Sequence, residues 1–449
     1  MKAPKSLLIS SLLLCSCSTP NEAYRNRLDS WDRLQRDEWK PREETSAGWP
    51  DQAGLPELLA YARVHNPALQ AAFEGWRIAL EQVTIGSALP NPRLTLGGYL
   101  SEVETRVGPI DGSIGIAQPL PWFGKLQLQG DMAFEASEAA REQLEDERLS
   151  LDQRLRDAWY EYSWVEQAIL ITQRNQELLA HWESVARSRN ATGLGNHADV
   201  IRAQVELGKL EDRVQTLKDL RRPLEARVNA ALNRPSAALL PKPLAKLPEA
   251  PELDEALLAA ALEASNPKLR AMHHRIRSSE LGVDLADKAF YPDLVLGVDY
   301  TLVGSAINPA LSGSGEDAIA LKLGIDLPIW RSKLNAGARA SEALARQARL
   351  EQSDMLNQLQ AELEMALYQF RDADRRVELF NQSLIPKGEE SIQALDIAYQ
   401  SGDQGFLDLI DAQRVLLEFQ LQAVRASSDR ARAVAKLMMV SGVVIPLEN

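Results

Sequence analysis

The sequence predicts an α+β membrane protein in which β-strands and very long helices alternate in two tandem structural repeats. Three observations lead to this prediction. Short motifs of the first half recur in the same order in the second half, some segments alternate apolar and polar residues, and others lack Gly and Pro over many helical turns. The 449-residue chain is long enough for two or three ordinary domains.

The N-terminus has the pattern of a secretory signal. Lys2 and Lys5 precede an apolar run at 7–14, in the order of the charged and apolar regions of a signal peptide. The run is shorter than the roughly 20 residues that a helix needs to span a bilayer. No other part of the sequence predicts a transmembrane helix.

A lipid attachment motif follows the apolar run. Leu14-Cys15-Ser16-Cys17 resembles the lipobox of bacterial lipoproteins, with Cys17 as the acceptor. This resemblance implies a signal peptide over 1–16 and a lipidated N-terminal extension over 17–50, and Ser18 suggests the outer membrane as the destination. The alternative is a signal peptide without lipid that is cleaved slightly downstream.

Internal repetition divides the chain in two. Asn66-Pro67 recurs as Asn266-Pro267, 200 residues later. Three more matches follow in order, with an offset that grows to 209 residues: 92–97 with 292–297, 119–123 with 326–330, and 199–204 with 408–413. The sequence therefore predicts a first repeat over 51–240, a Pro-rich linker over 241–253 and a second repeat over 254–445.

Each repeat contains a long helical hairpin. Residues 131–192 include neither Gly nor Pro, enough for a helix of about 90 Å. Apolar residues recur there at heptad spacing, which indicates packing against neighbouring long helices: Leu144, Leu151, Ala158, Val165, Leu179 and Ala186. We expect hairpins over 123–232 and 331–440, with turns at 191–198 and 401–407 and a kink near Pro386.

Between the helices the hydrophobic period drops to two residues. Strands are predicted at about 92–103 and 111–120 in the first repeat and at about 292–304 and 315–327 in the second. Each has one apolar face and one polar, Gly-containing face, which fits strands with lipid on one side and water on the other. A soluble sheet with one buried face has the same pattern. The export signal and the small number of strands favour the membrane.

Four strands are too few to close a barrel. An open sheet in a bilayer would leave backbone N–H and C=O groups unsatisfied, so several chains must contribute to one barrel. Three chains would supply twelve strands, but two or four chains would also close a barrel.

Four further motifs are Ser383-Leu384-Ile385-Pro386, Ala398-Tyr399-Gln400-Ser401-Gly402, the run from Leu407 to Arg414 with Leu417, and the run from Ala117 to Lys125. With these motifs the sequence resembles the TolC-type outer-membrane efflux proteins, over about 51–445. The resemblance implies a homotrimer whose 12-stranded β-barrel, four strands from each chain, is continued by a long α-helical barrel in the periplasm.

The sequence offers no catalytic constellation, cofactor motif or metal site. The five His residues are scattered, and the adjacent His273 and His274 point about 100° apart on a helix. Gly193-Leu194-Gly195 lacks the strand and the lysine of a phosphate-binding loop. A net charge of −13 provides no basic surface for nucleic acid.

Asp408 and Asp411 are the strongest candidate site residues. They are spaced i,i+3 beside a predicted turn, and in a trimer they would form two rings of carboxylates that attract cations. The family resemblance places them at the narrow periplasmic end of the channel. The alternative role for Asp408 is a helix N-cap.

Further candidate gate partners lie around the same turns. The first repeat has Asp199 and Arg202 at the equivalent positions, so Arg202 is a candidate for a latch to either acid of the second repeat. Gln404 stands where family members carry a basic gate residue, and Tyr399 is a further candidate.

The resemblance implies a passive exit duct of a tripartite efflux system. Its partners would be outer-membrane lipid, a periplasmic adaptor (membrane fusion) protein and an inner-membrane pump, for which the RND type is favoured over the ABC type. Residues 121–125 suggest the metal-exporting branch. The alternatives are a channel for type I protein secretion and a secreted coiled-coil scaffold.

Overall fold

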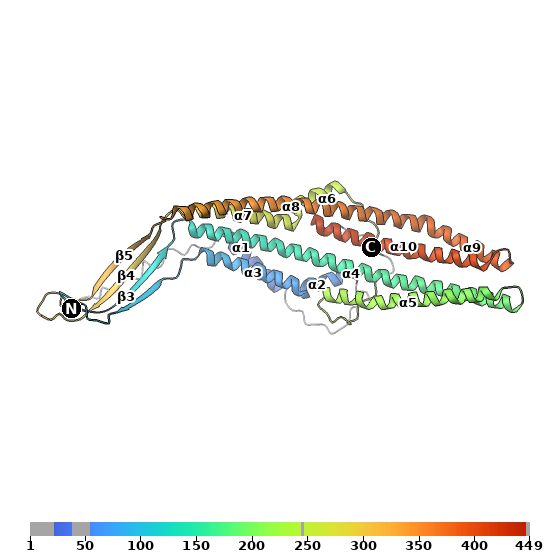
Figure 1. Ribbon diagram of the computed structural model, residues 1–449, viewed down its shortest axis with the longest axis horizontal. Coiled ribbons are helices and arrows are strands. Elements are labelled where there is room, and N and C mark those ends of the chain that lie inside the picture. Colours follow the sequence, from blue (N-terminus) through green and yellow to red (C-terminus); the bar gives the residue numbers. More distant parts are fainter. Residues whose placement is uncertain (1–21, 38–53, 244–246, 446–449) are drawn as a thin grey trace. The chain divides into compact units, whose positions relative to one another are not determined.

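The computed structural model describes residues 22–37, 54–243 and 247–445 (Figure 1). The chain forms two compact units. The strand unit comprises Met1–Leu34, Glu74–Arg141 and Ala271–Ser353, and the hairpin unit comprises Gln35–Phe73, Glu142–Arg270 and Asp354–Asn449. Each unit takes segments from both halves of the sequence. Within the described ranges, no helix is both long and apolar enough to cross a bilayer.

The strand unit contains an antiparallel sheet in the order β1-β3-β4-β5. These strands are β1 (Arg93–Gly98), β3 (Gly108–Leu120), β4 (Asp293–Val303) and β5 (Ala318–Asp326), and the two-residue β2 (Glu104–Thr105) pairs with β3. All four predicted strands are present. The first is shorter than the predicted 92–103, because the chain leaves the ladder after Gly97-Gly98, where two residues without side chains weaken strand pairing.

The strand register collects the apolar residues on one face. Leu94 pairs with Ile116, Ile116 with Val298, and Val298 with Leu321, and directly paired residues lie on the same face of a sheet. The exposed apolar side chains of this face are Leu94, Leu96, Ile114, Ile116, Leu296, Val298, Tyr300, Leu302, Ile319, Leu321, Leu323 and Ile325. We call this the apolar sheet face.

The opposite, polar sheet face is lined by small and charged residues. Lys322 forms an ion pair with Asp299 of the neighbouring strand. Gly115 leaves room beside this pair, because a methyl group there would push the Asp299 carboxylate aside. The two faces confirm the predicted alternation of apolar and polar residues along the strands.

A helix not predicted from the sequence, α1 (Glu22–Asp37), lies within the predicted N-terminal extension. Its Tyr24 hydroxyl hydrogen-bonds the Thr84 hydroxyl at 2.7 Å, on α3 (Pro67–Ser87). Arg27 donates two hydrogen bonds, of 2.7 and 2.8 Å, to the Glu138 carboxylate. The buried Trp31 ring lies 4.4 Å below the Arg77 guanidinium. These contacts attach α1 firmly to the strand unit.

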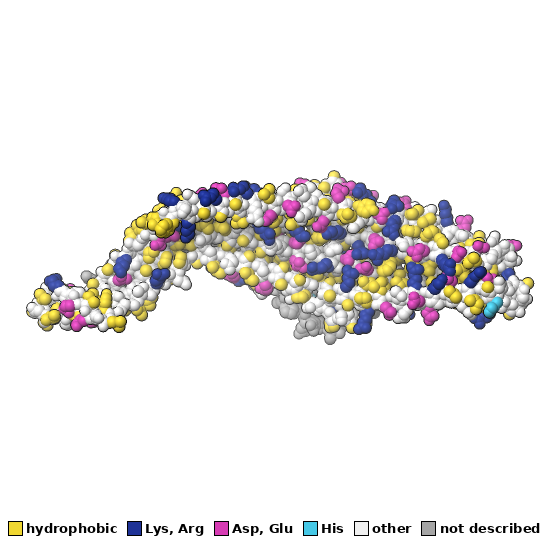
Figure 2. Space-filling model, in the orientation of Figure 1, with side chains coloured by type: hydrophobic (Ala, Val, Ile, Leu, Met, Phe, Trp, Pro, Cys, Tyr) yellow, Lys and Arg dark blue, Asp and Glu magenta, His cyan; other side chains and the backbone are white. Residues whose placement is uncertain are grey.

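The hairpin unit is built mainly from the long helices, two of which begin within the strand unit. They are α4 (Lys125–Ala191), α5 (His197–Ala231), α8 (Arg331–Glu378), the π-helical segment η1 (Leu379–Leu384), α9 (Ile385–Ser401) and α10 (Phe406–Ser441). Figure 1 shows α9 and α10 side by side up to their turn. The predicted turns are therefore correct. A π-helical segment ends just before Pro386, and the kink expected there stays a prediction. Figure 2 shows many charged side chains over the helices, as expected for solvated helix faces.

Both copies of the Asn-Pro motif have the same structural role. Asn66 ends α2 (Leu55–His65), and Asn266 ends α6 (Glu255–Ser265). Their side-chain oxygens accept hydrogen bonds from the N–H groups that begin α3 and α7 (Pro267–Lys288), at 3.0 and 2.9 Å. Their amide nitrogens donate to the carbonyls of Ala231 and Val440, near the ends of α5 and α10. This equivalence supports the predicted repeats, whose boundaries stay a prediction.

The heptad residues form the core of the hairpin unit. Leu151, Val165 and Leu179 are at most 1% exposed, as their spacing predicted. A further apolar cluster joins Leu258 and Leu262 of α6 to residues of α8 and α10, such as Leu363 and Leu437. The helices are therefore held mainly by buried apolar seams.

Candidate functional site: the hairpin tips

The candidate site is formed by the two helical turns of the hairpin unit, which we call the hairpin tips: residues 192–196 between α4 and α5, and 402–405 between α9 and α10. Gly193 and Gly402 have positive φ angles of 75° and 89°, which favour glycine. The Asn196 side chain caps α5 by accepting a 3.0 Å hydrogen bond from the Ala198 N–H. The local sequence thus explains both turns.

Arg189, near the end of α4, joins the two hairpin tips. Its Nη1 donates a 2.8 Å hydrogen bond to the Gln400 carbonyl, and its Nη2 donates a 3.3 Å bond to the Leu194 carbonyl. Its guanidinium carbon lies 5.0 Å from the centre of the Tyr399 ring. Sequence reasoning did not identify Arg189, because its partners are backbone carbonyls that leave no residue pattern.

Tyr399 is a buried residue of the second tip. Its side chain is 4% exposed and packs against the Phe406 ring, with ring centres 5.2 Å apart. Burial raises the pKa of the Tyr399 hydroxyl, and the negative charge of Asp199 raises it further. Tyr399, one of the candidate gate partners, thus contributes apolar packing and a neutral hydroxyl to the second tip.

Asp408 and Asp411 both lie on the exposed surface at the start of α10. Gly405 is the N-cap of this helix and no side chain caps it, so the capping role considered for Asp408 is wrong. Asp408 lies in the first turn, where a carboxylate is favoured by the helix dipole. Gln404 is exposed in the turn, and its backbone N–H donates to the Ala398 carbonyl at 3.2 Å.

Near the tips, the ion pair between the hairpins differs from the expected one. Arg202 pairs with Asp199 of its own helix at 3.6 Å, so the chain does not form the considered latch from Arg202 to Asp408 or Asp411. Arg414 instead joins α10 to α5. Its Nε donates a 3.0 Å hydrogen bond to Glu206, and its Nη1 donates a 2.9 Å bond to Asp411. We call the Glu206–Arg414 pair the tip ion pair.

The tip ion pair is partly shielded from water. Glu206 is 8% exposed, whereas the Arg414 side chain is 46% exposed. Hydrogen bonding from Arg414, aided by Lys209, lowers the pKa of Glu206, and the same interaction raises the pKa of Arg414. Both partners are therefore charged at neutral pH.

Beyond the tips, three amide side chains join α4 to α10. Gln413, 1% exposed, donates a 3.1 Å hydrogen bond to the Asn175 side-chain oxygen. Asn175 in turn donates a 3.0 Å bond to the side-chain oxygen of Gln420, one heptad further along α10. Buried amides of this kind favour one register between packed helices.

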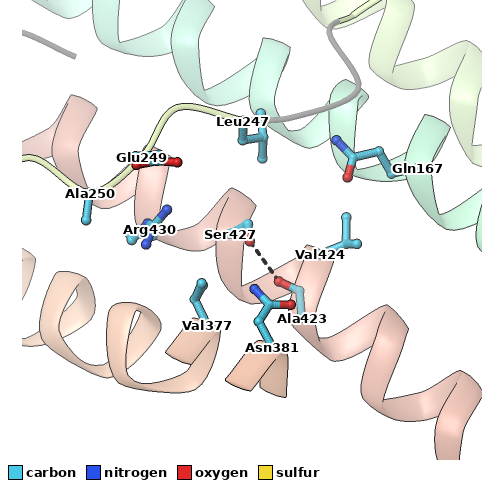
Figure 3. Close-up of a pocket in the computed structure, with 10 residues that line it drawn as sticks. All are labelled: Gln167, Leu247, Glu249, Ala250, Val377, Asn381, Ala423, Val424, Ser427 and Arg430. Carbon is cyan, nitrogen blue, oxygen red and sulfur yellow. Dashed lines mark hydrogen bonds between the residues drawn. The ribbon is translucent and has the colours of Figure 1, made fainter. Parts of the chain in front are cut away.

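A cavity of about 570 Å³ also lies in the hairpin unit, beside η1 (Figure 3). Arg430 in its lining donates to Asp374 at 2.8 Å and to the Pro248 carbonyl at 3.2 Å. Ser427 donates a 3.0 Å hydrogen bond to the Ala423 carbonyl of its own helix.

The described residues of the chain contain no cluster of three or more His, Cys, Asp or Glu side chains able to hold a metal ion.

Comparison with known protein families finds a match in both halves of the chain. Residues 58–234 and 258–443 match the family model described as outer membrane efflux protein. The pyoverdine export outer membrane protein OpmQ of Pseudomonas putida is 21% identical to the chain, with 96% of this chain and 95% of that protein covered.

Two solved structures share the fold. The outer membrane protein VceC of Vibrio cholerae matches with a TM-score of 0.72 and 18% identity, over 87% of this chain and 97% of that one. CusC, whose structures concern transmembrane channel formation, matches with a TM-score of 0.76 and 16% identity, over 90% of this chain and 96% of that one.

Proposed function

The chain belongs to the outer membrane efflux protein family, and on that premise we propose that three copies assemble into one channel that conducts its cargo passively across the outer membrane. The observation that carries this proposal is the apolar sheet face. Its twelve exposed apolar side chains line one side of a sheet whose other side carries the Lys322–Asp299 ion pair. Such a sheet suits a barrel wall between lipid and water.

The edges of the sheet support assembly from several chains. In the described part of the chain, β1 and β5 each pair with a strand on one side only. Open edges in a bilayer leave backbone groups unsatisfied, so β5 of one copy would pair with β1 of the next. Three copies would supply a 12-stranded barrel, continued by an α-helical barrel in the periplasm. The number three rests on the family resemblance.

We assign the hairpin tips the role of binding the periplasmic partner of the channel. They would meet a periplasmic adaptor protein, which connects the duct to an energised inner-membrane pump, of the RND type in preference to the ABC type. Relatives are named for pyoverdine export, multidrug resistance, and toxin and drug export, so their names support export and do not agree on a cargo. Sensitivity of a deletion strain to antibiotics and metal ions would identify the cargo, including that of a metal-exporting branch.

A lipid on Cys17 would add a second attachment to the membrane. Cys17 lies outside the described residues, five positions before α1 begins at Glu22. Five residues span at most about 17 Å, so the lipid would lie near the start of α1. Tyr24 there contacts Thr84, less than one turn before α3 ends and leads into β1. The anchor would therefore sit at the level where the strands begin.

Native mass spectrometry of the protein purified from outer membranes tests assembly and lipidation together. We expect a trimer that dissociates on heating, with acyl chains on each copy that Cys17→Ser removes. The trimer is also expected to conduct ions in planar bilayers. A monomer without conductance would overturn the proposed channel, whereas a conducting trimer without acyl chains would overturn only the lipid anchor.

Asp408 and Asp411 are proposed as carboxylate rings at the narrow end of the channel. Replacing both by Asn should lower the preference for cations over anions, because neutral amides no longer attract cations into the pore. Reversal potentials in a KCl gradient measure this preference. Asp212→Asn, at an exposed position of α5, is the control and should leave it unchanged. An unaltered reversal potential in the double variant would contradict the ring assignment.

A further inference from the structure

A cavity of about 510 Å³ lies at the end of the sheet in the strand unit, between the start of α4 and the end of α7. Helix α7 leads into β4 and helix α4 follows β3, and these two strands are paired neighbours. The polar and aromatic side chains in the lining are Gln127, Asp284, Asp287, Lys288 and Tyr291. We call it the junction cavity.

The walls of the junction cavity are well supported. The Trp122 and Tyr291 rings stack with centres 5.5 Å apart and planes 14° apart. The Trp122 backbone N–H and the Lys125 ammonium each donate a 2.7 Å hydrogen bond to Asp293, the first residue of β4. A ligand there would meet preformed walls, which reduces the entropy lost on binding.

The charged groups of the junction cavity are not used in ion pairs within the described part of the chain. Asp284, Asp287 and Lys288 form no ion pair with any residue that the structure describes, although Asp284 and Lys288 are spaced i,i+4. The Lys288 ammonium lies 5.6 Å from the centre of the Tyr291 ring. One ammonium and two carboxylates around a single cavity match a zwitterion that carries both a phosphate and an ammonium.

With the sheet in the membrane as proposed above, the junction cavity would lie at the membrane interface. The apolar sheet face ends beside it, and two exposed aromatic residues follow the strands at this end: Phe123, 78% exposed, and Trp330, 72% exposed. Aromatic side chains are enriched where membrane barrels meet the head groups. On α4 the lining residues Gln127 and Leu128 lie about 160° and 60° around the helix from Lys125, which reaches Asp293 on the polar sheet face. The cavity therefore lies to one side of the Lys125–Asp293 pair.

We propose that the junction cavity binds the head group of a phosphoethanolamine phospholipid. Lys288 and the Gln127 amide would hold the phosphate, and Asp284 and Asp287 would hold the ammonium. The inference rests on the proposed membrane position of the sheet. The cavity should bind a zwitterionic head group in preference to an anionic one, because the carboxylates of Asp284 and Asp287 repel an additional negative charge.

Native mass spectrometry of the detergent-solubilised channel, titrated with dioleoyl phosphatidylethanolamine or dioleoyl phosphatidylglycerol, tests this site. We expect the ethanolamine lipid to bind more tightly, and Lys288→Ala to weaken it about tenfold through loss of the charged hydrogen bond. Asp284→Asn with Asp287→Asn should abolish the preference between the two lipids. Lys333→Ala, at an exposed lysine near the start of α8, is the matched control and should have no effect.

The outcomes separate this site from the proposed channel. Equal binding of both lipids by the unmodified channel, or binding unaffected by Lys288→Ala, would overturn the head-group site. Each variant is first checked for trimer mass and conductance. Because the Asn substitutions keep the shape of exposed side chains, they test the site even if Lys288→Ala impairs folding. A protein that forms neither trimer nor pore would overturn the channel itself.

Discussion

Replacing Leu321 by Arg is expected to deplete the trimer from the outer membrane severely. Leu321 is 85% exposed on the apolar sheet face, and it pairs with Val298 in the middle of the sheet. An Arg that faces lipid at the bilayer midplane costs about 2–4 kcal/mol, and each of three copies would carry one. The measurement is the amount of heat-sensitive trimer in outer-membrane fractions relative to total protein.

The neighbouring residue provides the matched control. Ala320 precedes Leu321 in β5 and pairs with Asp299 on the polar sheet face. Ala320→Arg adds the same charge beside an existing carboxylate, so the trimer should form normally. If Ala320→Arg depletes the trimer and Leu321→Arg does not, the apolar sheet face does not contact lipid. Equal effects of both variants would also contradict the assignment.

Replacing Arg414 by Ala is expected to open the narrow end of the channel. The change leaves the buried Glu206 carboxylate without its main partner and removes the ion pair between α10 and α5 that lies nearer the tip. A second pair between these helices, Arg213–Glu418 at 3.6 Å, is kept. The loss in stability is about 1 kcal/mol, because the exposed guanidinium is partly screened by solvent. Single-channel conductance in planar bilayers should rise, because the start of α10 is then held less tightly against α5.

Arg202→Ala is the control for this variant, because its pair with Asp199 lies within one helix and cannot join the hairpins. Its conductance should equal that of the unmodified channel. Glu206→Gln should increase conductance as Arg414→Ala does, and the double variant should add little, as expected for two residues of one pair. An additive double variant would show that the two residues act independently.

The tip ion pair also determines the expected response to pH. The pKa of Glu206 is lowered in the folded chain, so its stabilising contribution is present above the ordinary carboxylate pKa of about 4.3. It is lost only as the pH falls through the lowered pKa. Between pH 7 and 5 the difference in conductance between the unmodified channel and Glu206→Gln should therefore stay constant. A difference that disappears in this range would contradict the assignment.

Much of this architecture could be predicted from residues close together in the sequence. The apolar residues Leu294, Leu296 and Val298 alternate with other residues along β4, and this alternation predicts which residues lie on each face of the strand. The heptads of α4 report its buried seam in the same way. Gly193 and Gly402 mark the two turns, since few other residues tolerate positive φ angles.

The residues that pair across the hairpin tips could not be predicted from the local sequence pattern. Both Arg202 and Arg414 stand near a turn, but only the packed helices place Arg414 against Glu206, 208 residues away. Arg189 binds backbone carbonyls, and α1 attaches through Tyr24, Arg27 and Trp31, whose partners are distant in sequence. The sequence by itself determined the type, length and apolar faces of the strands and long helices, because these depend on local periodicity. The tertiary structure alone decided which charges meet, because that depends on the register between helices that the local pattern does not specify.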